Sequence, residues 1–292
     1  MSVEETMGVE ITGVERSTAS AAQPRLLARY RDPELANAFK PPAWNVVLDT
    51  MLAHRSVRHY RDEPLPPGLL ETLVAAAQSA PTSSNLQAWS VLAVQDADRK
   101  ARLAKLAAGQ RHVAEAPLLL VFLADVARLR AASRARGQTA EGLDYLETFI
   151  VALADAAFAA QNALTAAESL GLGGCYIGAM RNHPREVAKE LGLPDDVFAV
   201  FGLTLGYPDP AVETDVKPRL PQTIVLHRER YAQASPDALA AYDERLRGFR
   251  SDQQMTDIAW TEQAAGRVRD RTSLMGRHAL REILQSRGFG LR

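Results

Sequence analysis

Apolar residues recur along the chain with two spacings, one typical of helices and one of strands. We expect short helices over residues 44–53, 68–80, 98–107 and 184–191. Other runs have the composition of strands, at residues 89–94, 117–124 and 197–205. The second of these runs, PLLLVFLA, has no polar side chain, so we expect both of its faces to be covered. Strands separated by helices indicate an α+β or α/β fold with an antiparallel or mixed sheet.

The longest apolar segment begins near Leu143 and ends at the glycine cluster GLGG. Asp155, like other polar residues in this segment, would be costly in hydrocarbon, so a buried helix is a better interpretation than a membrane span. The nearly all-round apolar surface predicts burial in a large core or against a second subunit. Gly171 or Gly173 can adopt the left-handed conformation that ends a helix, and we expect a glycine-rich loop from there to Gly178.

The two ends of the chain differ in composition from its middle. Residues 1–25 combine Glu, Ser, Thr and Ala with few large apolar side chains, so we expect a disordered N-terminal extension. The same segment lacks the apolar stretch of a signal peptide. Residues 26–234 form the expected folded core. Residues 235–292 form an expected helical excursion, which closes with an amphipathic helix over residues 261–286.

Charge and cysteine content narrow the functional classes. The chain carries 34 basic and 35 acidic side chains, a net charge of -1, which gives no electrostatic reason for a nucleic-acid partner. The single cysteine, Cys175, cannot form an internal disulfide, which fits a reducing cytoplasm, and we interpret it as a small buried residue. His112 and His183 lack metal-ligand spacing, so no metal is predicted. Acidic residues intersperse the arginines of residues 267–281, which favours a solvated or intersubunit face.

Candidate chemistry begins in the stretch HRSVRHYR, residues 54–61. Guanidinium groups and a serine hydroxyl in such a cluster suit a phosphate, although the stretch taken alone is better interpreted as a solvated charged turn. Three further features accompany it: the hydroxyl and amide loop TSSN, the glycine cluster, and a second cation pair held between prolines. Together these features suit a phosphorylated, heteroaromatic ligand.

The motifs RSVR, SAPTSSNLQAW, GQRHV, ESLGLGGCYIGAMRN, FGLTLGYP and VKPRLP occur in that order. In this order and spacing the chain resembles the nitroreductase superfamily, and within it the oxygen-insensitive NADPH nitroreductase and NADPH–FMN oxidoreductase subgroup. The resemblance covers about residues 44–245. It implies an α+β, sandwich-like fold, a homodimer in the cytoplasm, and FMN bound without a covalent bond at each of two subunit-interface sites.

The resemblance also implies which residues bind FMN. Its phosphate would be held by the side chains of His54, Arg55, Ser56, Lys217 and Arg219. Arg58 would lie by the flavin N1 and C2 carbonyl edge, where it would stabilise the negative charge of the reduced ring. Hydrogen bonds to the ribityl chain and pyrimidine edge would come from Thr82, Ser83, Ser84 and Gln110. Tyr176, Ile177 and Gly178 would place a backbone N–H toward flavin N5.

The implied reaction needs no side-chain nucleophile, so no catalytic residue is assigned. NADPH, or NADH, would reduce bound FMN, which would then reduce nitroaromatics, quinones or flavins in a two-electron ping-pong reaction. Arg181 matches a family position that contacts the acceptor, and a surface arginine is an equally good interpretation. Residues 248–260 hold only Arg250, whereas the subgroup has several arginines there for the NADPH 2′-phosphate.

Other functions stay open. Flavin reduction with release of the product, or dehalogenation, would use the same scaffold. A non-catalytic flavin-binding, redox-sensing module is a function of another class, and a structural dimer without ligand would make the cation clusters coincidental. No nucleic-acid or membrane partner is expected.

Overall fold

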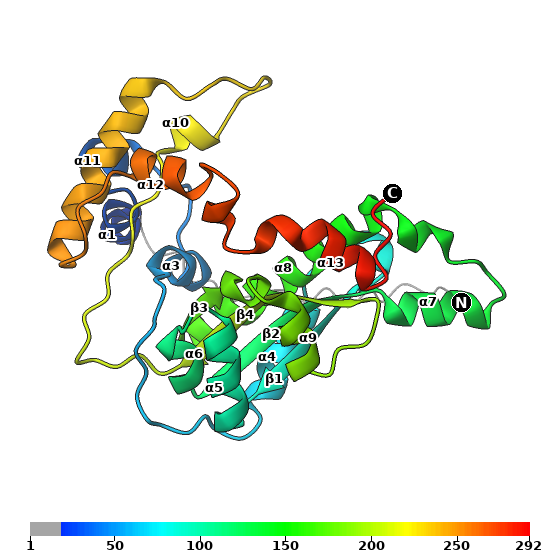
Figure 1. Ribbon diagram of the computed structural model, residues 1–292. Coiled ribbons are helices and arrows are strands. Elements are labelled where there is room, and N and C mark those ends of the chain that lie inside the picture. The colour runs from blue at the N-terminus through cyan, green and yellow to red at the C-terminus, as the bar shows by residue number, and fades with distance from the viewer. Residues whose placement is uncertain (1–18) are drawn as a thin grey trace, which may run out of the picture. The chain divides into compact units, whose positions relative to one another are not determined.

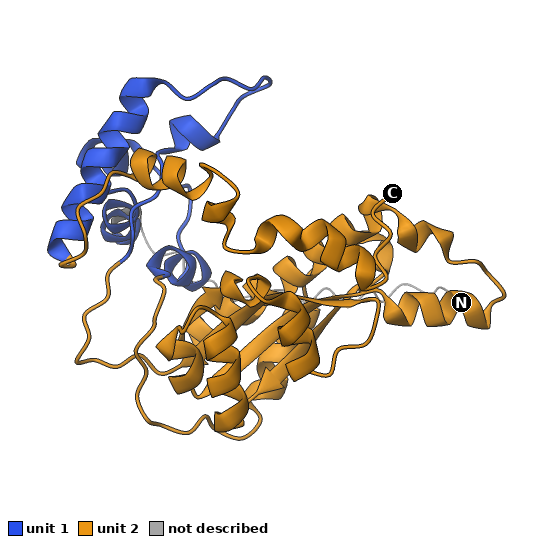
Figure 2. Cartoon of the chain, in the orientation of Figure 1, with its two compact units in different colours: residues 1–54, 216–252 blue, residues 55–215, 253–292 orange. Residues whose placement is uncertain are grey.

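The computed structural model describes residues 19–292, which divide into two compact units (Figure 2). Unit 1 contains residues 19–54 and 216–252, and unit 2 contains residues 55–215 and 253–292. Most of the predicted disordered extension, residues 1–18, lies outside the described residues. Helix α1 (Ala19–Tyr30) begins before the predicted boundary at residue 25.

Unit 1 is helical and has a small core of its own. It contains α1, α2 (Pro33–Ala38), α3 (Val46–Ala53), α10 (Gln222–Val225) and α11 (Pro236–Asp252). Ala22, Leu26, Ala36 and Trp44 are buried together in its core. The predicted helix at residues 44–53 is present but begins at Val46, because the side chain of Asn45 accepts a hydrogen bond from the Leu48 N–H and caps it.

Unit 2 is built on a four-stranded antiparallel sheet with strand order β1-β2-β4-β3 (Figure 1). The strands are β1 (Trp89–Val94), β2 (Leu118–Asp125), β3 (Gly173–Ile177) and β4 (Val197–Gly206). Three of them match the predicted runs, and the α+β fold with an antiparallel sheet is confirmed. Alternate residues of β2 face two separate hydrophobic clusters, so both faces of this strand are covered as predicted.

The prediction of a glycine-rich loop over residues 171–178 is wrong, because its middle forms β3. Gly171, with φ of +82°, ends the preceding helix as predicted, and the extended strand begins at Gly173. Close packing explains the glycines that follow. A Cβ on Gly174 would lie 2.8 Å from the carbonyl oxygen of Thr204 in the neighbouring strand. These glycines therefore serve close approach of strands, which sequence alone does not distinguish from loop flexibility.

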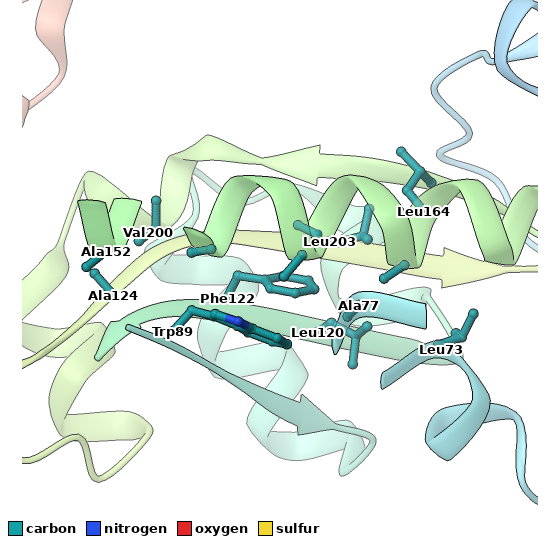
Figure 3. Packing of buried hydrophobic residues seen from close by; sticks show 14 of the residues in the cluster. Leu73, Ala77, Trp89, Leu120, Phe122, Ala124, Ala152, Leu164, Val200 and Leu203 are labelled. Carbon is teal, nitrogen blue, oxygen red and sulfur yellow. The ribbon is translucent and has the colours of Figure 1, made fainter. Parts of the chain in front are cut away.

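Helices cover both faces of the sheet. They are α4 (Leu69–Gln78), α5 (Ala97–Leu106), α6 (Arg111–Glu115), α8 (Leu146–Ser169) and α9 (Pro184–Glu190), whereas α7 (Ala127–Ala135) has no buried residue. Helix α8 lies against the strands above Phe122 and Trp89, whose rings stack at 6.2 Å (Figure 3). Small residues on its buried face, such as Ala152 and Ala156, permit this close approach.

The other side of α8 leaves large apolar groups exposed. Ile150, Leu153 and Phe158 are among them, so the helix is less buried within one chain than its composition suggests. By length and composition alone α8 also qualifies as a membrane-spanning helix, a test that the core helix of a soluble protein passes as well.

The single amphipathic helix predicted over residues 261–286 is wrong. The segment forms α12 (Trp260–Arg267) and α13 (Leu280–Ser286), with two short 3-10 turns between them. Met275 and Gly276 both adopt positive φ, which interrupts an α-helix. A Cβ on Gly276 would lie 2.9 Å from the carbonyl oxygen of Asn182, so tertiary packing fixes the break.

Candidate functional site

The cation stretch of residues 55–61 runs beside strand β3 in unit 2. The Val57 N–H donates to the Gly174 carbonyl at 2.9 Å, and the Arg61 N–H donates to the Tyr207 carbonyl at 2.9 Å. Val57 is buried, whereas Arg58 is exposed. The backbone of this stretch is therefore fixed against the sheet while the side chain of Arg58 remains available.

A half-buried tyrosine holds the same stretch in place. The Tyr60 hydroxyl donates to the Val57 carbonyl at 2.7 Å and shares a hydrogen bond of 2.8 Å with the Thr204 hydroxyl. Burial raises the pKa of Tyr60 well above its usual range. Nearer the start of the stretch, Arg55 Nε donates to the Thr214 hydroxyl at 3.1 Å, which orients the guanidinium.

The hydroxyl loop lies between α4 and β1. Thr82 is half-buried, while Ser83 and Ser84 are exposed. Left-handed backbone occurs at Ser84, Asn85 and Gln87, with φ of 49°, 55° and 50°. Non-glycine residues seldom adopt this conformation, and clusters of it are typical of functional sites.

Asp155 of α8 fixes both ends of this loop. One carboxylate oxygen accepts the Ser83 N–H at 3.1 Å, and the other accepts the Ala88 N–H at 3.0 Å. Sequence analysis missed this role, because Asp155 counted there only against a membrane span. The available signal was a carboxylate in the middle of the most apolar part of this helix, since such a group needs partners inside the protein.

The end of β3 presents Tyr176, Ile177 and Gly178. The Tyr176 ring packs edge-on against Phe201 at 5.3 Å, and Ile177 is buried. If Gly178 carried a Cβ, its three nearest atoms would all belong to the Arg181 side chain, the first at 3.4 Å. A ligand can therefore approach the backbone at Gly178 once that flexible side chain moves.

Helix α8 contacts both the hydroxyl loop and the end of β3. Asp155 holds the loop, and Gln161 accepts from the Tyr176 hydroxyl at 3.5 Å. These positions are six residues apart, about 9 Å along a helix. His112, two residues beyond Gln110, has its pKa lowered by burial and by the charges of Arg58 and His59. The charges of Arg58 and His59 therefore act on His112, in the helix that follows Gln110.

Two arginines lie together beyond Gly178. Arg181 donates to the Val200 carbonyl, and burial lowers its pKa. Arg277 Nε donates to the Asn182 amide oxygen at 2.9 Å. Burial, followed by the charges of Arg181 and Arg267, lowers the pKa of Arg277. Among residues 19–292, no carboxylate forms an ion pair with Arg181 or Arg277, so the pair is suited to an anion.

Sequence analysis assigned no role to Arg277, because its arginine-rich segment looked like a solvated helix. The interrupted helix in fact turns this side chain onto Asn182, which is buried. Its neighbours in sequence gave no signal of that contact. Cys175, in contrast, is buried as predicted. No group of three or more His, Cys, Asp or Glu in the described part of the chain has metal-site geometry.

His54, Lys217 and Arg219 belong to unit 1, where the backbone of each is hydrogen-bonded to one buried arginine, Arg29. Arg29 donates to the carbonyl of His54 at 2.8 Å and to that of Lys217 at 3.2 Å. The Arg219 N–H in turn donates to the Arg29 carbonyl at 2.9 Å. The side chains of Lys217 and Arg219 are exposed. Arg29 lies close to the disputed N-terminal boundary, and sequence analysis gave it no role.

Known proteins resemble this chain over most of its length. A sequence profile described as "Nitroreductase family" matches residues 51–207, and one described as "Nitroreductase family, C-terminal domain" matches residues 217–292. The chain is 42% identical over 200 residues to the oxygen-insensitive NADPH nitroreductase of Salmonella typhimurium, covering 68% of this chain and 80% of that protein. It is 36% identical over 251 residues to the FMN reductase (NADPH) of Bacillus subtilis, covering 84% and 98%.

Solved structures give the same result. The NADPH:FMN oxidoreductase from Vibrio harveyi, complexed with NAD+, superposes with a TM-score of 0.75 at 32% identity, covering 85% of this chain and 100% of that chain. NfrA2 of B. megaterium superposes with a TM-score of 0.79 at 34% identity, with coverage of 85% and 100%. The matching motifs, the shared fold and these identities establish that the chain belongs to the nitroreductase family.

Proposed function

We propose that this protein is an FMN-dependent NAD(P)H oxidoreductase that reduces nitroaromatics, quinones or flavins by two-electron ping-pong transfer. The observation that carries the proposal is the backbone register between Ser56–Val57 and Gly174. This register puts the start of the cation stretch beside β3, which ends at Ile177, just before Gly178. Relatives with 36% and 42% identity carry the names FMN reductase (NADPH) and NADPH nitroreductase, which supports the same activity here.

The residues of unit 2 fit FMN. Arg55 and Ser56 would bind the phosphate, and Thr82, Ser83, Ser84 and Gln110 the ribityl chain and pyrimidine edge. The left-handed loop supports this assignment, because it exposes Ser83 and Ser84 while its ends are held. Gly178 supports it as well, since no side chain of its own blocks the backbone. His54, Lys217 and Arg219 of unit 1 stay predicted phosphate ligands.

Bound FMN would supply hydride transfer from a nicotinamide to an acceptor. Each protein group then has a physical task. The exposed guanidinium of Arg58 would offset negative charge on the flavin pyrimidine edge, and the fixed backbone of its stretch keeps that charge in place. The backbone around Tyr176, Ile177 and Gly178 would face N5. No side-chain acid or base is required, since solvent can supply protons.

Arg181 and Arg277 would bind the negatively polarised oxygens of a nitro group, or an anionic group such as a carboxylate or a nucleotide phosphate. Their lack of carboxylate partners supports this role. The arginines near residue 250 are less available to a 2′-phosphate than Arg181 and Arg277. Arg250 is 6% exposed, and Arg245 is paired with Asp32 at 2.6 Å. We therefore treat NADPH and NADH as donors to be compared directly.

We also propose a cytoplasmic homodimer. The exposed apolar side chains of α8, Ile150, Leu153 and Phe158, support a second copy as their cover, because exposed apolar surface is unfavourable in water. The one cysteine, which is free and buried, is compatible with a reducing compartment.

The visible spectrum of the purified protein tests the proposed activity. Under anaerobic conditions, NADPH and NADH are added in separate cuvettes, and a nitroaromatic acceptor follows. We expect the flavin absorbance to bleach with at least one donor and to return with the acceptor. Protein that stays colourless after reconstitution with FMN would contradict the proposal. Bound FMN that neither nucleotide bleaches would instead favour the non-catalytic, redox-sensing module.

A further inference from the structure

Unit 2 contains a carboxylate that is buried without a cation. Asp155 is 1% exposed, and no lysine, arginine or histidine among residues 19–292 forms an ion pair with it. Removal of a charge from water is unfavourable unless other groups compensate it. Here the compensation comes from two backbone N–H groups, those of Ser83 and Ala88. The carboxylate is therefore committed to the loop and to nothing else.

We propose that Asp155 is a positioning residue for flavin binding, which holds residues 82–88 in the conformation that presents Thr82, Ser83 and Ser84 to FMN. This inference rests on the proposed function. Asp155 does not touch the ligand in this account. It acts through the backbone of the loop.

The geometry supports this role over a purely structural one. The two carboxylate oxygens accept from opposite ends of the loop, at 3.1 and 3.0 Å, so a single side chain closes it. Between those ends, Ser84, Asn85 and Gln87 have left-handed backbone that is unfavourable for residues with a Cβ. A loop without this restraint would relax toward commoner conformations. The buried charge thus maintains a strained conformation, as expected where structure is kept for binding.

An isosteric substitution tests the inference. In Asp155→Asn one backbone N–H keeps an acceptor, while the other faces the amide NH2. Asn162→Ala is the matched control, because Asn162 lies on the same helix and bonds the Ser79 hydroxyl, outside the loop. FMN is titrated into each apoprotein, and thermal unfolding of the apoproteins is recorded in parallel.

We expect the dissociation constant of FMN to rise about 10- to 100-fold in Asp155→Asn and to change less than twofold in Asn162→Ala, in the range seen when groups that orient a ligand's direct contacts are lost. The apoprotein of Asp155→Asn should remain folded but unfold at a lower temperature, because one buried N–H loses its acceptor, at a cost of about 1–3 kcal/mol. An unchanged dissociation constant in Asp155→Asn would overturn the inference while leaving the proposed function intact. Failure of the unsubstituted protein to bind FMN would overturn both.

Two further measurements keep the inference testable if Asp155→Asn does not fold. Hydrogen exchange of the unsubstituted apoprotein should show protected amides at Ser83 and Ala88, and free exchange at both would refute the restraint. Gln87→Gly removes the Cβ at one left-handed position. Added to Asp155→Asn, it should recover part of the lost FMN affinity, whereas no recovery in a folded double variant would contradict a role through loop strain.

Discussion

The guanidinium of Arg277 lies near two other arginines, and its hydrogen-bond partner among residues 19–292 is a neutral amide. Arg181 and Arg267 both lower its pKa, after burial itself. A neutral amide oxygen on Asn182 orients the group without neutralising it. The positive charge of Arg277 is therefore not neutralised in the free protein, and a bound anion would neutralise it. For this reason we expect the residue to contribute to ligand affinity more than to stability.

Substitution of this residue should separate those two effects. In Arg277→Gln we expect KM for an anionic substrate to rise roughly 10- to 100-fold, the range for a lost hydrogen bond to a charged group. Tm should stay the same or rise, because like-charge repulsion is reduced. Steady-state kinetics and thermal unfolding measure the two quantities. Arg281→Gln, on α13 and exposed, is the control. An equal effect in both variants would reduce the role of Arg277 to general surface charge.

Individual site residues were predictable from sequence only where a motif placed them. Arg58 and the serines of the hydroxyl loop follow from the family resemblance, and their assignment to FMN remains a prediction. Asp155, Arg29 and Arg277 act through contacts with residues that are distant in sequence. Their neighbours along the chain carry no sign of those contacts, so a single sequence could not reveal them.

At the scale of elements, the packing of β3 against the cation stretch depends on Gly173. A Cβ there would lie 2.5 Å from Val57 Cγ2 and 2.9 Å from Val57 Cβ. We expect Gly173→Ala to lower the free energy of unfolding by about 2–3 kcal/mol, at the upper end of the cost of overpacking. FMN affinity should fall as well, because Val57 carries the backbone between Ser56 and Arg58. Urea unfolding and FMN titration measure the two effects.

Gly266→Ala provides the matched control for that substitution. Gly266 lies inside α12, and no atom lies within 4 Å of the position its Cβ would take. Alanine is favoured over glycine in helices, so this variant should gain about 0.5–1 kcal/mol. If Gly173→Ala were as stable as the Gly266→Ala control, the close approach of Val57 to Gly173 would not restrain β3.

The hydrogen bonds of Tyr60 predict a specific response to alkaline pH. Because burial raises its pKa above the unfolded value, about 10, the folded state binds this proton more tightly. The stabilisation is fully present below about pH 10 and decreases as the pH rises further. Tyr60→Phe should remove part of that decrease and cost roughly 1–2 kcal/mol at pH 7, from the lost hydrogen bonds. The free energy of unfolding of both proteins is measured with urea at pH 7, 9 and 11. Identical pH profiles for the two proteins would contradict the predicted contribution of Tyr60.

The elements that sequence predicted correctly share one property: their pattern is determined locally. β2 has an unbroken apolar run, and α8 has a helical one. The errors fell where tertiary contacts decide. β3 contains glycines that would suit a loop, yet pairing with β4 makes it extended. The helix beyond Trp260 has a continuous amphipathic pattern, yet packing of Gly276 on Asn182 interrupts it.

For the whole molecule, the exposed side of α8 leads to the dimer prediction. Phe158 is 52% exposed. Burial of such a ring contributes about 2–3 kcal/mol, so Phe158→Glu should weaken dimerisation at least ~100-fold, or ~2.7 kcal/mol. Sedimentation velocity across a range of concentrations measures the dissociation. Ala101→Glu, on the exposed side of α5, should leave it unchanged. A monomeric unsubstituted protein would contradict the proposed homodimer.

The position of β2 in the middle of the sheet affects how the chain folds as it is synthesised. Leu118 pairs with Leu205, so a ribosome must add about 90 residues, or ~4–18 s of translation, before β4 can pair with β2. During that delay only β1 can pair with it, and one edge of a strand that is apolar from Leu118 to Ala124 stays open. Such edges promote aggregation. A chaperone that covers this edge during synthesis should therefore increase the soluble yield more than a change in the final buffer.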